Sequence, residues 1–347
     1  MNFSKLFFSN RMFKIDPAGM PRKLALLDVG ARGGIQWPFD QIGRDLLSVV
    51  MVEPDPVEAA LLKQSFEASG DRVLESALWS EDKVLSLNIT RSPGASSVFK
   101  PDRKFLDQFP ESKRFDILQT PEVEAKTIDG LASANKLPSI DFIKIDAQGA
   151  ELAILEGGRK FLQSQLVGLE VEISFASQYT GQALFADAET FVRTQLGLEL
   201  WDLRKSYWKY RPGHAGAGPV KGRLIFGDAL FLRPLESLEA WLGSMPDASA
   251  QEKATMLVLA ALLYGYIDYA NALLTTPFVA GYLGVRQAEM LSLLVRSAGG
   301  GLRPFLNGSG ALFAFFDGLS RAFQPTHGGW ASVGQRLGSR RRGPLWL

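Results

Sequence analysis

Two short apolar runs near the start of the chain define its first pattern. Residues 24–27 read LALL and lead into Asp28, and residues 46–52 read LLSVVMV and lead into Glu53. Short apolar runs of this kind are typical of buried parallel strands, and the segment between them is long enough for a helix, so we predict a βαβ unit. Each strand would end in a carboxylate, at the sheet edge where doubly wound folds bind ligands.

The turn after the first run is rich in glycine, with the spacing G-x-x-G-G at Gly30, Gly33 and Gly34. A dinucleotide site would need G-x-G-x-x-G, and the chain has no G-K-[ST] phosphate loop. An acid after the second strand, here Glu53, can accept hydrogen bonds from both hydroxyls of a ribose. The spacing therefore favours S-adenosylmethionine, a nucleoside cofactor without a pyrophosphate, over a tight turn in some other α/β protein.

Further apolar and alternating runs predict more strands, and helical spacing predicts helices between them, as expected for an α/β domain. The predicted strands cover residues 73–78, 84–89, 119–126, 140–145, 166–175, 198–210 and 223–232. The predicted helices cover residues 56–69, 150–156 and 186–195. Residues 101–113 are polar, and we expect that segment to be mobile.

From residue 235 onward the spacing is helical and indicates no further strand. Residues 256–267 form the most apolar stretch, which is too short to span a bilayer and is predicted to be a buried helix. The predicted organisation is an N-terminal extension (1–22), an α/β domain (23–234), a helical accessory region (235–298) and a Gly/Arg-rich tail (299–347).

Composition narrows the range of functions. The 38 basic and 37 acidic residues nearly cancel, so no nucleic-acid partner is expected. The absence of cysteine excludes disulfides and thiolate chemistry, and two histidines are too few for a histidine metal cluster. No apolar run in the first residues is long enough for a signal peptide, so we expect a cytoplasmic protein.

Six motifs occur in the order seen in a known family. They read LLDVGARGG, VVMVEPDP, ESALWS, SPGASSVF, AKTIDGL and IDFIKIDAQGAELAILEGG. On these motifs the chain resembles the FkbM family of S-adenosylmethionine-dependent methyltransferases over residues 23–233. Two positions depart from the family pattern, because Gln148 stands where glutamate is usual and Arg32 stands where asparagine is often found.

The resemblance implies a class I methyltransferase (Rossmann-like) fold of the α/β class, with a mostly parallel seven-stranded sheet that includes one antiparallel strand. The α-helical C-terminal extension lies outside the resemblance. The implied reaction is O-methylation of a glycan, glycolipid or secondary metabolite. Carried over position by position, the resemblance assigns cofactor binding to Asp28, Gly30, Ala31 and Gly33 in the turn, to Glu53 at the ribose, to Ala77 near the adenine and to Asp146 at the sulfonium end.

Methyl transfer to an alcohol is helped by a base that takes the hydroxyl proton. Asp146 and Glu172 are the candidate catalytic bases, because both are expected at the carboxyl ends of neighbouring central strands. Lys144 would share a strand face with Asp146, so we predict that it holds the acceptor oxygen or lowers the pKa of that carboxylate. Magnesium between the two carboxylates is a weaker alternative, because no third ligand is identified, and no metal ligand is assigned.

Two other functions are alternatives to an O-methyltransferase: a nucleotide-dependent oxidoreductase and a non-catalytic scaffold. The glycine spacing argues against a nucleotide-dependent oxidoreductase, and the intact acids Asp28, Glu53 and Asp146 argue against a non-catalytic scaffold. The expected partner is a small-molecule or glycan acceptor, and the oligomeric state is left open. Arg336 and Arg340–Arg342 suit peripheral contact with the inner face of an anionic membrane, and the alternative is a solvated tail.

Overall fold

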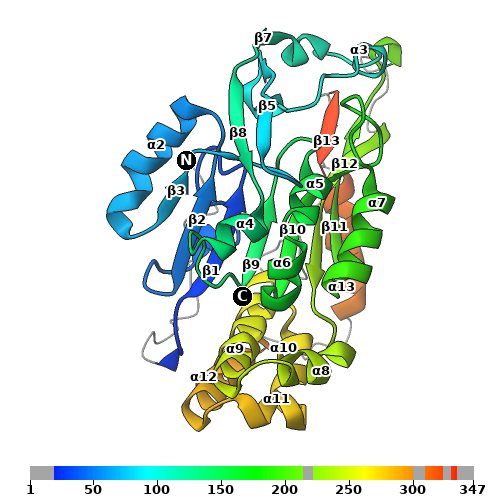
Figure 1. The fold of residues 1–347 in the computed structure, drawn as a ribbon. Helices are drawn as coiled ribbons and strands as arrows, with labels where there is room; N and C mark the ends of the chain where they lie inside the picture. The colour runs from blue at the N-terminus through cyan, green and yellow to red at the C-terminus, as the bar shows by residue number, and fades with distance from the viewer. Residues whose placement is uncertain (1–18, 214–221, 300–308, 323–329, 334–347) are drawn as a thin grey trace.

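The computed structural model describes residues 19–213, 222–299, 309–322 and 330–333 (Figure 1). Its centre is an eight-stranded sheet with the strand order β13-β11-β12-β10-β9-β1-β2-β3. The strands are β1 (Leu24–Val29), β2 (Leu47–Val52), β3 (Arg72–Leu74), β9 (Phe142–Ile145), β10 (Gly168–Ser174), β11 (Glu199–Trp208), β12 (Arg223–Leu232) and β13 (Ala331–Val333).

Seven of these strands form the mostly parallel sheet that the family resemblance implies. Strands β3, β2, β1, β9 and β10 pair in parallel, whereas β12 runs opposite to both of its neighbours, β10 and β11. The seven-stranded prediction is one strand short, because β13 adds an eighth strand antiparallel to β11. Trp330, which precedes β13, packs on Trp208 of β11 with the ring centroids 5.2 Å apart, and this contact helps to hold the short strand.

The predicted helix between β1 and β2 is wrong. Residues 30–46 are all described, and they contain only the 3-10 turn η2 (Phe39–Gln41). The sheet face beside this connection is covered from the C-terminal part of the chain by α9 (Asp247–Tyr264), which is buried from Lys253 to its end. Tyr264 stacks on Phe142 of β9 at 5.5 Å, and Phe39 contacts both rings. The predicted buried helix is thus confirmed, although it ends at Tyr264.

Helices cover the other face of the sheet and one edge of it. The first set is α4 (Ile128–Ser133), α5 (Glu151–Glu156), α6 (Arg159–Gln165) and α7 (Phe185–Phe191), followed by the π-turn η6 (Val192–Leu196). Their apolar residues share a second hydrophobic cluster with β1, β9, β10 and β12. Helix α2 (Pro56–Phe66) instead packs into the cluster that contains α9, through Ala59 and Leu62. Gly70 (φ 85°) ends the α2 segment, as predicted.

The C-terminal helices gather at one end of the sheet, at the bottom of Figure 1. They are α8 (Leu238–Gly243), α9, α10 (Ile267–Thr275), α11 (Pro277–Tyr282) and α12 (Val285–Gly299). Their apolar residues belong to the same hydrophobic cluster as one face of β1, β2 and β9. The predicted domain boundary after residue 234 stays a prediction, and one continuous core crosses it.

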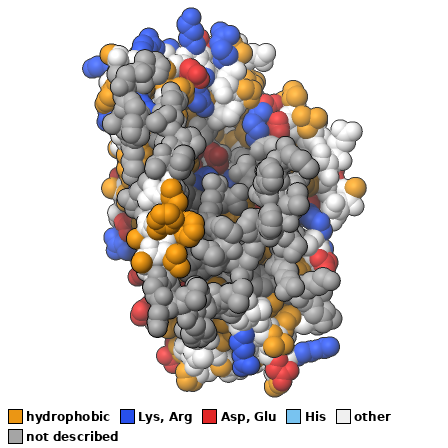
Figure 2. All heavy atoms as spheres, turned by 180° about the vertical axis from the view of Figure 1, so that it is seen from behind, with side chains coloured by type: hydrophobic (Ala, Val, Ile, Leu, Met, Phe, Trp, Pro, Cys, Tyr) orange, Lys and Arg blue, Asp and Glu red, His pale blue; other side chains and the backbone are white. Residues whose placement is uncertain are grey.

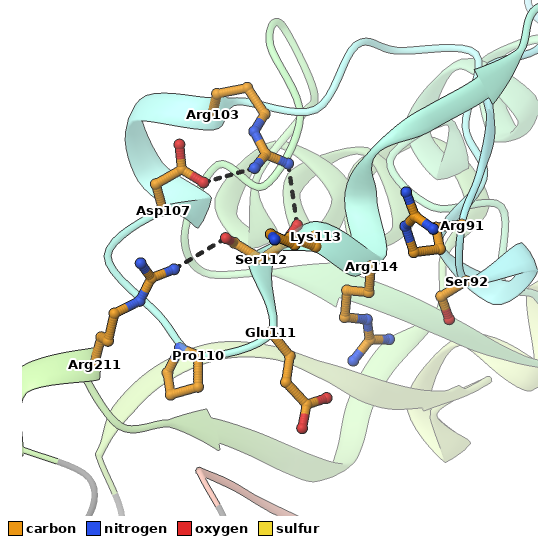
Figure 3. Close-up of a pocket in the computed structure, with 10 residues that line it drawn as sticks. All are labelled: Arg91, Ser92, Arg103, Asp107, Pro110, Glu111, Ser112, Lys113, Arg114 and Arg211. Carbon is orange, nitrogen blue, oxygen red and sulfur yellow. Dashed lines mark hydrogen bonds and ion pairs between the residues drawn. The ribbon is translucent and has the colours of Figure 1, made fainter.

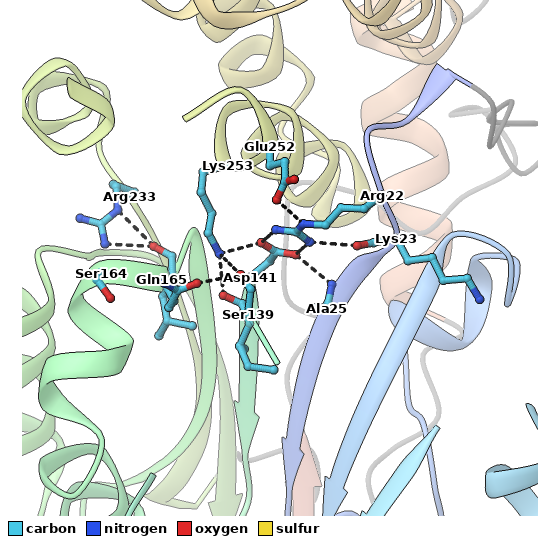
Figure 4. A network of polar contacts seen from close by, with 12 residues as sticks. Arg22, Lys23, Ala25, Ser139, Asp141, Ser164, Gln165, Arg233, Glu252 and Lys253 are labelled. Atoms are coloured by element: carbon cyan, nitrogen blue, oxygen red, sulfur yellow. Dashed lines mark hydrogen bonds and ion pairs between the residues drawn. The ribbon is translucent and has the colours of Figure 1, made fainter. Parts of the chain in front are cut away.

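A buried charge network joins this helical region to the sheet (Figure 4). Asp141, which precedes β9, accepts hydrogen bonds from Arg22 at 2.5 and 2.7 Å and from Lys253 of α9 at 2.9 Å. Burial alone would raise the pKa of Asp141, but the hydrogen bond from Arg22 and the charge of Lys253 outweigh burial and lower it. Residue 22 and the helical region are therefore both tied to the base of the sheet.

A small subdomain lies at the opposite end of the sheet, at the top of Figure 1. It contains β4 (Ala77–Leu78), β8 (Glu122–Lys126) and β5 (Lys83–Ser86) in one sheet and β6 (Ile89–Thr90) with β7 (Ile117–Gln119) in another. The strand predicted over residues 73–78 is therefore divided between two sheets. The segment 101–113, expected to be mobile, instead carries α3 (Arg103–Leu106) and is held by the buried rings of Phe105 and Phe109.

The predicted tail contains a helix, α13 (Ser309–Ala322), besides β13. On α13, Leu312, Phe315 and Phe316 are exposed. Seen from behind, the molecule shows a group of hydrophobic side chains on its surface (Figure 2). The arginines predicted to contact a membrane, Arg336 and Arg340–Arg342, lie outside the described residues. None of the described helices combines the length and apolar character needed to cross a bilayer.

Candidate active site

A cavity of about 260 Å³ lies at the carboxyl ends of β1, β2 and β9. Its wall combines the turn after β1 with the segment after β2, the strand β4, the turn after β9 and the loop between β6 and α3. The lining residues include Gly30, Arg32, Glu53, Asp55, Ala77, Leu78, Pro93, Ser97, Asp146, Ala147, Gln148 and Ile154. Four of the predicted cofactor residues, Gly30, Glu53, Ala77 and Asp146, thus line one cavity.

Gly30 brings two walls of the cavity together. Its backbone has a φ of 75°, and a Cβ atom at this position would overlap the carbonyl oxygen of Asp146. Only glycine lets the turn after β1 lie against the turn after β9. Gly33 also has a positive φ, of 79°, but nothing lies near the place of its Cβ, and Ala31 is buried in the hydrophobic cluster below.

Glu53 is a buried carboxylate in the wall, with 4% of its surface exposed. Burial raises its pKa to about 6, against the opposing effects of the Asp55 backbone N–H, which donates to Oε1 at 3.0 Å, and of the Arg32 charge. Arg32 pairs with Asp55 at 2.7 Å and with Glu58 at 3.0 Å, and lies 4.0 Å from Glu53. Arg32, which departs from the family pattern, is therefore the cation that pairs with the acidic segment Glu53–Glu58.

Gln148, the second departure from the family pattern, bridges two carboxylates. It has a φ of 52°, and its Nε2 atom donates to Oδ1 of Asp146 at 2.8 Å and to Oε1 of Glu172 at 2.9 Å. Both neighbours are acceptors, so the amide nitrogen rather than the oxygen must face them. Tyr179 donates its hydroxyl proton toward Oε1 of Gln148, at 3.0 Å, and toward the carbonyl oxygen of Ala95, at 2.9 Å.

The two predicted bases lie in different surroundings. Asp146 lines the cavity, whereas Glu172 lies behind Gln148 and outside the wall. Burial, together with the charges of Asp146 and Asp228, raises the pKa of Glu172 well above its ordinary value. Asp146 is therefore the carboxylate placed to meet a bound molecule.

Lys144 and Asp28 also lie outside the wall. Both are buried, and Nζ of Lys144 lies 3.8 Å from Oδ1 of Asp28. Burial would lower the pKa of Lys144, but the charges of Asp28 and Asp146 raise it overall, so the ammonium stays protonated. Lys144 thus contributes positive charge beneath the site and has no direct access to the cavity.

Two further residues support the turn after β9. Glu151 accepts hydrogen bonds from the backbone N–H groups of Ala147 and Gly149, each at 3.0 Å, and burial raises its pKa to about 7. Ser97 donates from its hydroxyl to the carbonyl oxygen of Gln148 at 2.7 Å. Glu151 was not predicted as a site residue, although it is the final Glu of the signature motif. Ser97 belongs to the SPGASSVF motif, where the sequence offers it as a residue covering the site or as part of an ordinary turn.

The residues do not fit the magnesium alternative. Magnesium binds through oxygen ligands, and the space between Asp146 and Glu172 holds the donor nitrogen of Gln148. Within the described ranges, no group of three or more His, Cys, Asp or Glu side chains is arranged to hold a metal ion.

The residues do fit S-adenosylmethionine. Glu53 offers carboxylate oxygens for ribose hydroxyls, and Ala77, Leu78 and Ile154 form an apolar wall suited to an adenine ring. The absence of a side chain on Gly30 lets a ligand approach the backbone. The cavity volume of about 260 Å³ is close to the lower limit, about 300 Å³, of typical ligand pockets.

Residues 28–200 match the methyltransferase FkbM domain. Similar solved structures include a methyltransferase FkbM from Methylobacillus flagellatus (12% identity, 60% of this chain, 44% of that chain, TM-score 0.33). A TehB-like SAM-dependent methyltransferase from Corynebacterium glutamicum is also similar (15% identity, 62% of this chain, 84% of that chain, TM-score 0.28). TrmK of M. capricolum in complex with S-adenosyl-homocysteine is a third (9% identity, 84% and 97% coverage, TM-score 0.30).

The chain spans less than half of the Methylobacillus structure that it matches. No curated protein matches it. The match over residues 28–200 contains the turn with Gly30, the acid Glu53 and the signature segment around Asp146, which together line the cavity. Through this domain the chain belongs to the FkbM family of methyltransferases.

Proposed function

We propose that this protein is an S-adenosylmethionine-dependent O-methyltransferase that acts on a hydroxyl of a glycan, glycolipid or secondary metabolite in the cytoplasm. The observation that carries the proposal is that one cavity is lined by Glu53, which suits a ribose, and by Asp146, which suits a hydroxyl proton. A nucleoside cofactor and an alcohol would then meet in the same space. The balanced charge of the chain gives no reason to expect a nucleic-acid acceptor.

The residues that line the cavity would bind and orient the cofactor. S-adenosylmethionine, when bound, supplies a methyl group already activated on a sulfonium sulfur. Glu53 accepts hydrogen bonds from the ribose hydroxyls, and Ala77 and Leu78 pack against the adenine. Because the methyl group is already activated, positioning is the main contribution of the protein, and it can supply about 7–11 kcal/mol of the barrier.

Asp146 acts as the base that takes the proton of the acceptor hydroxyl. Gln148 donates to one of its oxygens, at 2.8 Å, so the carboxylate is held in one orientation. A base placed in this way accelerates transfer by roughly 10²–10⁴-fold. Glu172 lies behind Gln148, and its raised pKa disfavours a second negative charge next to the site.

The test compares Asp146→Asn with Glu172→Gln. The assay follows transfer of labelled methyl from S-adenosylmethionine to fractionated cell-surface glycans, lipids and small metabolites. We expect Asp146→Asn to lower kcat by about 10²–10⁴-fold, because the base is lost. Glu172 lies outside the cavity wall, so the kcat of Glu172→Gln should fall by only about fivefold or less. Full activity of Asp146→Asn, or equal losses in the two variants, would remove Asp146 from the role of base.

Cofactor binding is measured separately by calorimetric titration of the same two variants with S-adenosylmethionine. Binding by both variants shows that the cofactor cavity is intact, so any loss of turnover comes from the chemical step. Failure of the wild-type protein to bind S-adenosylmethionine would overturn the proposal as a whole.

A further inference from the structure

A second and wider hollow lies on the small subdomain, with a volume of about 900 Å³ (Figure 3). We call it the basic hollow. Among the described residues that line it, five are cations and two are acids: Arg91, Arg103, Lys113, Arg114 and Arg211 against Asp107 and Glu111. The chain as a whole has a net charge of +1, so this surface concentrates positive charge that the rest of the molecule balances.

Two of these cations are not neutralised within the described part of the chain. Arg103 pairs with Asp107 at 2.7 Å and with Asp116 at 3.3 Å. Among the described residues, Lys113 and Arg114 have no ion pair. The Arg114 guanidinium lies over the ring of Phe115 at 5.3 Å, and its Nε atom is buried with no hydrogen-bond partner. A buried donor of this kind is costly unless a ligand satisfies it.

The turn that carries Lys113 and Arg114, η5 (Ser112–Phe115), is held in place from two sides. Arg103 donates to the carbonyl oxygen of Ser112 at 3.0 Å, and Arg211 donates to its hydroxyl at 3.1 Å. Figure 3 shows the two guanidinium groups directed at Ser112 from different elements. The cations of η5 are therefore presented on a fixed backbone, which lowers the entropy cost of binding an anion.

The basic hollow adjoins the cofactor cavity through one loop. Ser92 lines the hollow, and the next residue, Pro93, lines the cavity, so consecutive residues of one loop form part of both walls. A second connection runs inside the molecule, because Phe115 of η5 packs on Tyr179 at 6.1 Å. The Tyr179 hydroxyl in turn lies 3.0 Å from Gln148, which holds Asp146.

We propose that the basic hollow binds a phosphate group of the methyl acceptor while the acceptor hydroxyl reaches Asp146. This inference rests on the proposed function and names the chemical class of its substrate. Arginine and lysine bind phosphate through charge-assisted hydrogen bonds. The cofactor carries no phosphate and its cavity is lined by the acids Glu53 and Asp146, so the hollow serves the acceptor.

The test uses the full chain and inorganic pyrophosphate as the probe, titrated by calorimetry at low salt. Lys113→Ala and Arg114→Gln are each expected to weaken pyrophosphate binding by about tenfold or more, because a charge-assisted contact is lost. The matched control is Lys104→Ala, an exposed lysine that follows Arg103 but does not line the hollow, and its affinity should equal that of the wild type. Lys113 is exposed, so its variant retains the fold even if Arg114→Gln does not.

Titration of every variant with S-adenosylmethionine separates this proposal from the proposed function. Unchanged cofactor binding with weakened pyrophosphate binding supports a distinct anion site. No pyrophosphate binding by the wild type, or equal binding by the wild type, Lys113→Ala and Arg114→Gln, overturns the inference and leaves the methyltransferase proposal untouched.

A second arm identifies the source of the phosphate. The wild type and Lys113→Ala are mixed with vesicles of phosphatidylcholine, with and without phosphatidylglycerol. Binding to the anionic vesicles that is lost in Lys113→Ala assigns the phosphate to a lipid-linked acceptor. Pyrophosphate binding without vesicle binding assigns it to a soluble phosphorylated acceptor.

Discussion

The Nε2 atom of Gln148 lies 2.9 Å from Oε1 of Glu172. The same nitrogen donates to Asp146, so a single uncharged amide separates a carboxylate in the cavity wall from a second carboxyl group behind it, whose pKa is raised by burial and by neighbouring acids. Glutamate, the usual residue of the family at this position, would place a third acid here. The substitution at residue 148 therefore sets the charge of the site.

Gln148→Glu should place a third carboxyl group between Asp146 and Glu172 and create a site that binds a cation. We expect the variant to lose about 1–3 kcal/mol of unfolding free energy, because the bridging donor is removed and acids face one another. Added magnesium should raise the melting temperature of Gln148→Glu. The wild type and Gln148→Met should not respond to the metal. Equal shifts in all three proteins, measured by thermal unfolding, would contradict this prediction.

Cofactor affinity should depend on pH through Glu53, whose pKa is raised to about 6. The carboxylate accepts hydrogen bonds from the ribose and the protonated form accepts them less well, so affinity should fall as the pH drops below about 6. Calorimetric titration with S-adenosylmethionine between about pH 5 and 8 measures this. Glu53→Gln should bind about tenfold more weakly and without this pH dependence. A flat wild-type profile would place the ribose elsewhere.

Gly30 and Gly33 form a matched pair for testing the turn after β1. Both have a positive φ, but only at Gly30 would an added Cβ overlap the backbone of Asp146. Gly33→Ala should lose roughly 1–2 kcal/mol of unfolding free energy from backbone strain alone. Gly30→Ala should lose more and should weaken S-adenosylmethionine binding by about tenfold or more. Equal effects of the two changes on cofactor affinity would show that the close approach at Gly30 is not needed.

The free energy of unfolding should fall as the pH rises, because of Glu170. Burial raises the pKa of this carboxyl to about 7, although the hydroxyl of Tyr264 donates a hydrogen bond to it at 2.6 Å. A raised acid pKa favours the folded state below the unfolded pKa, about 4.3, and this advantage is lost as the pH rises toward 7. The loss amounts to about 3 kcal/mol, as an order of magnitude.

Glu170→Gln should therefore gain stability relative to the wild type between about pH 5 and 8, as measured by urea unfolding. Glu156→Gln makes the same change at an exposed position of α5 and provides the control. A difference between wild type and Glu170→Gln that does not change with pH would mean that Glu170 ionises as readily in the folded protein as in the unfolded chain.

The edge of the sheet that carries the site was predictable from the sequence. Apolar runs that end at Glu53 and just before Asp146 place both carboxylates at the carboxyl ends of parallel strands, here the two that flank β1, and the structure brings both into one cavity. Lys144 and Glu172 could not be placed in the same way. Each lies on a predicted strand, but whether its side chain reaches the cavity depends on the strand pleat and on what covers the sheet.

The sequence between β1 and β2 contains residues that disfavour the helix predicted there. The segment after Gly34 contains Pro38 and Gly43, which leave little room for a regular helix. The burial of Trp37 and Phe39 against Tyr264 had no such signal, because the partner lies more than two hundred residues away in the sequence. Contacts at that separation leave no periodic trace in either segment.

Helix α9 has a consequence for synthesis of the protein. On the ribosome, β1, β2 and β9 are complete long before Tyr264 is made, so their apolar face has no cover while the nascent chain grows. The domain can reach its final packing only after the C-terminal helices have emerged, and the waiting intermediate presents a hydrophobic sheet surface. The late arrival of α9 makes the emergence of the C-terminal helices, rather than the completion of the cofactor-binding segment, the event that commits this domain to its native state.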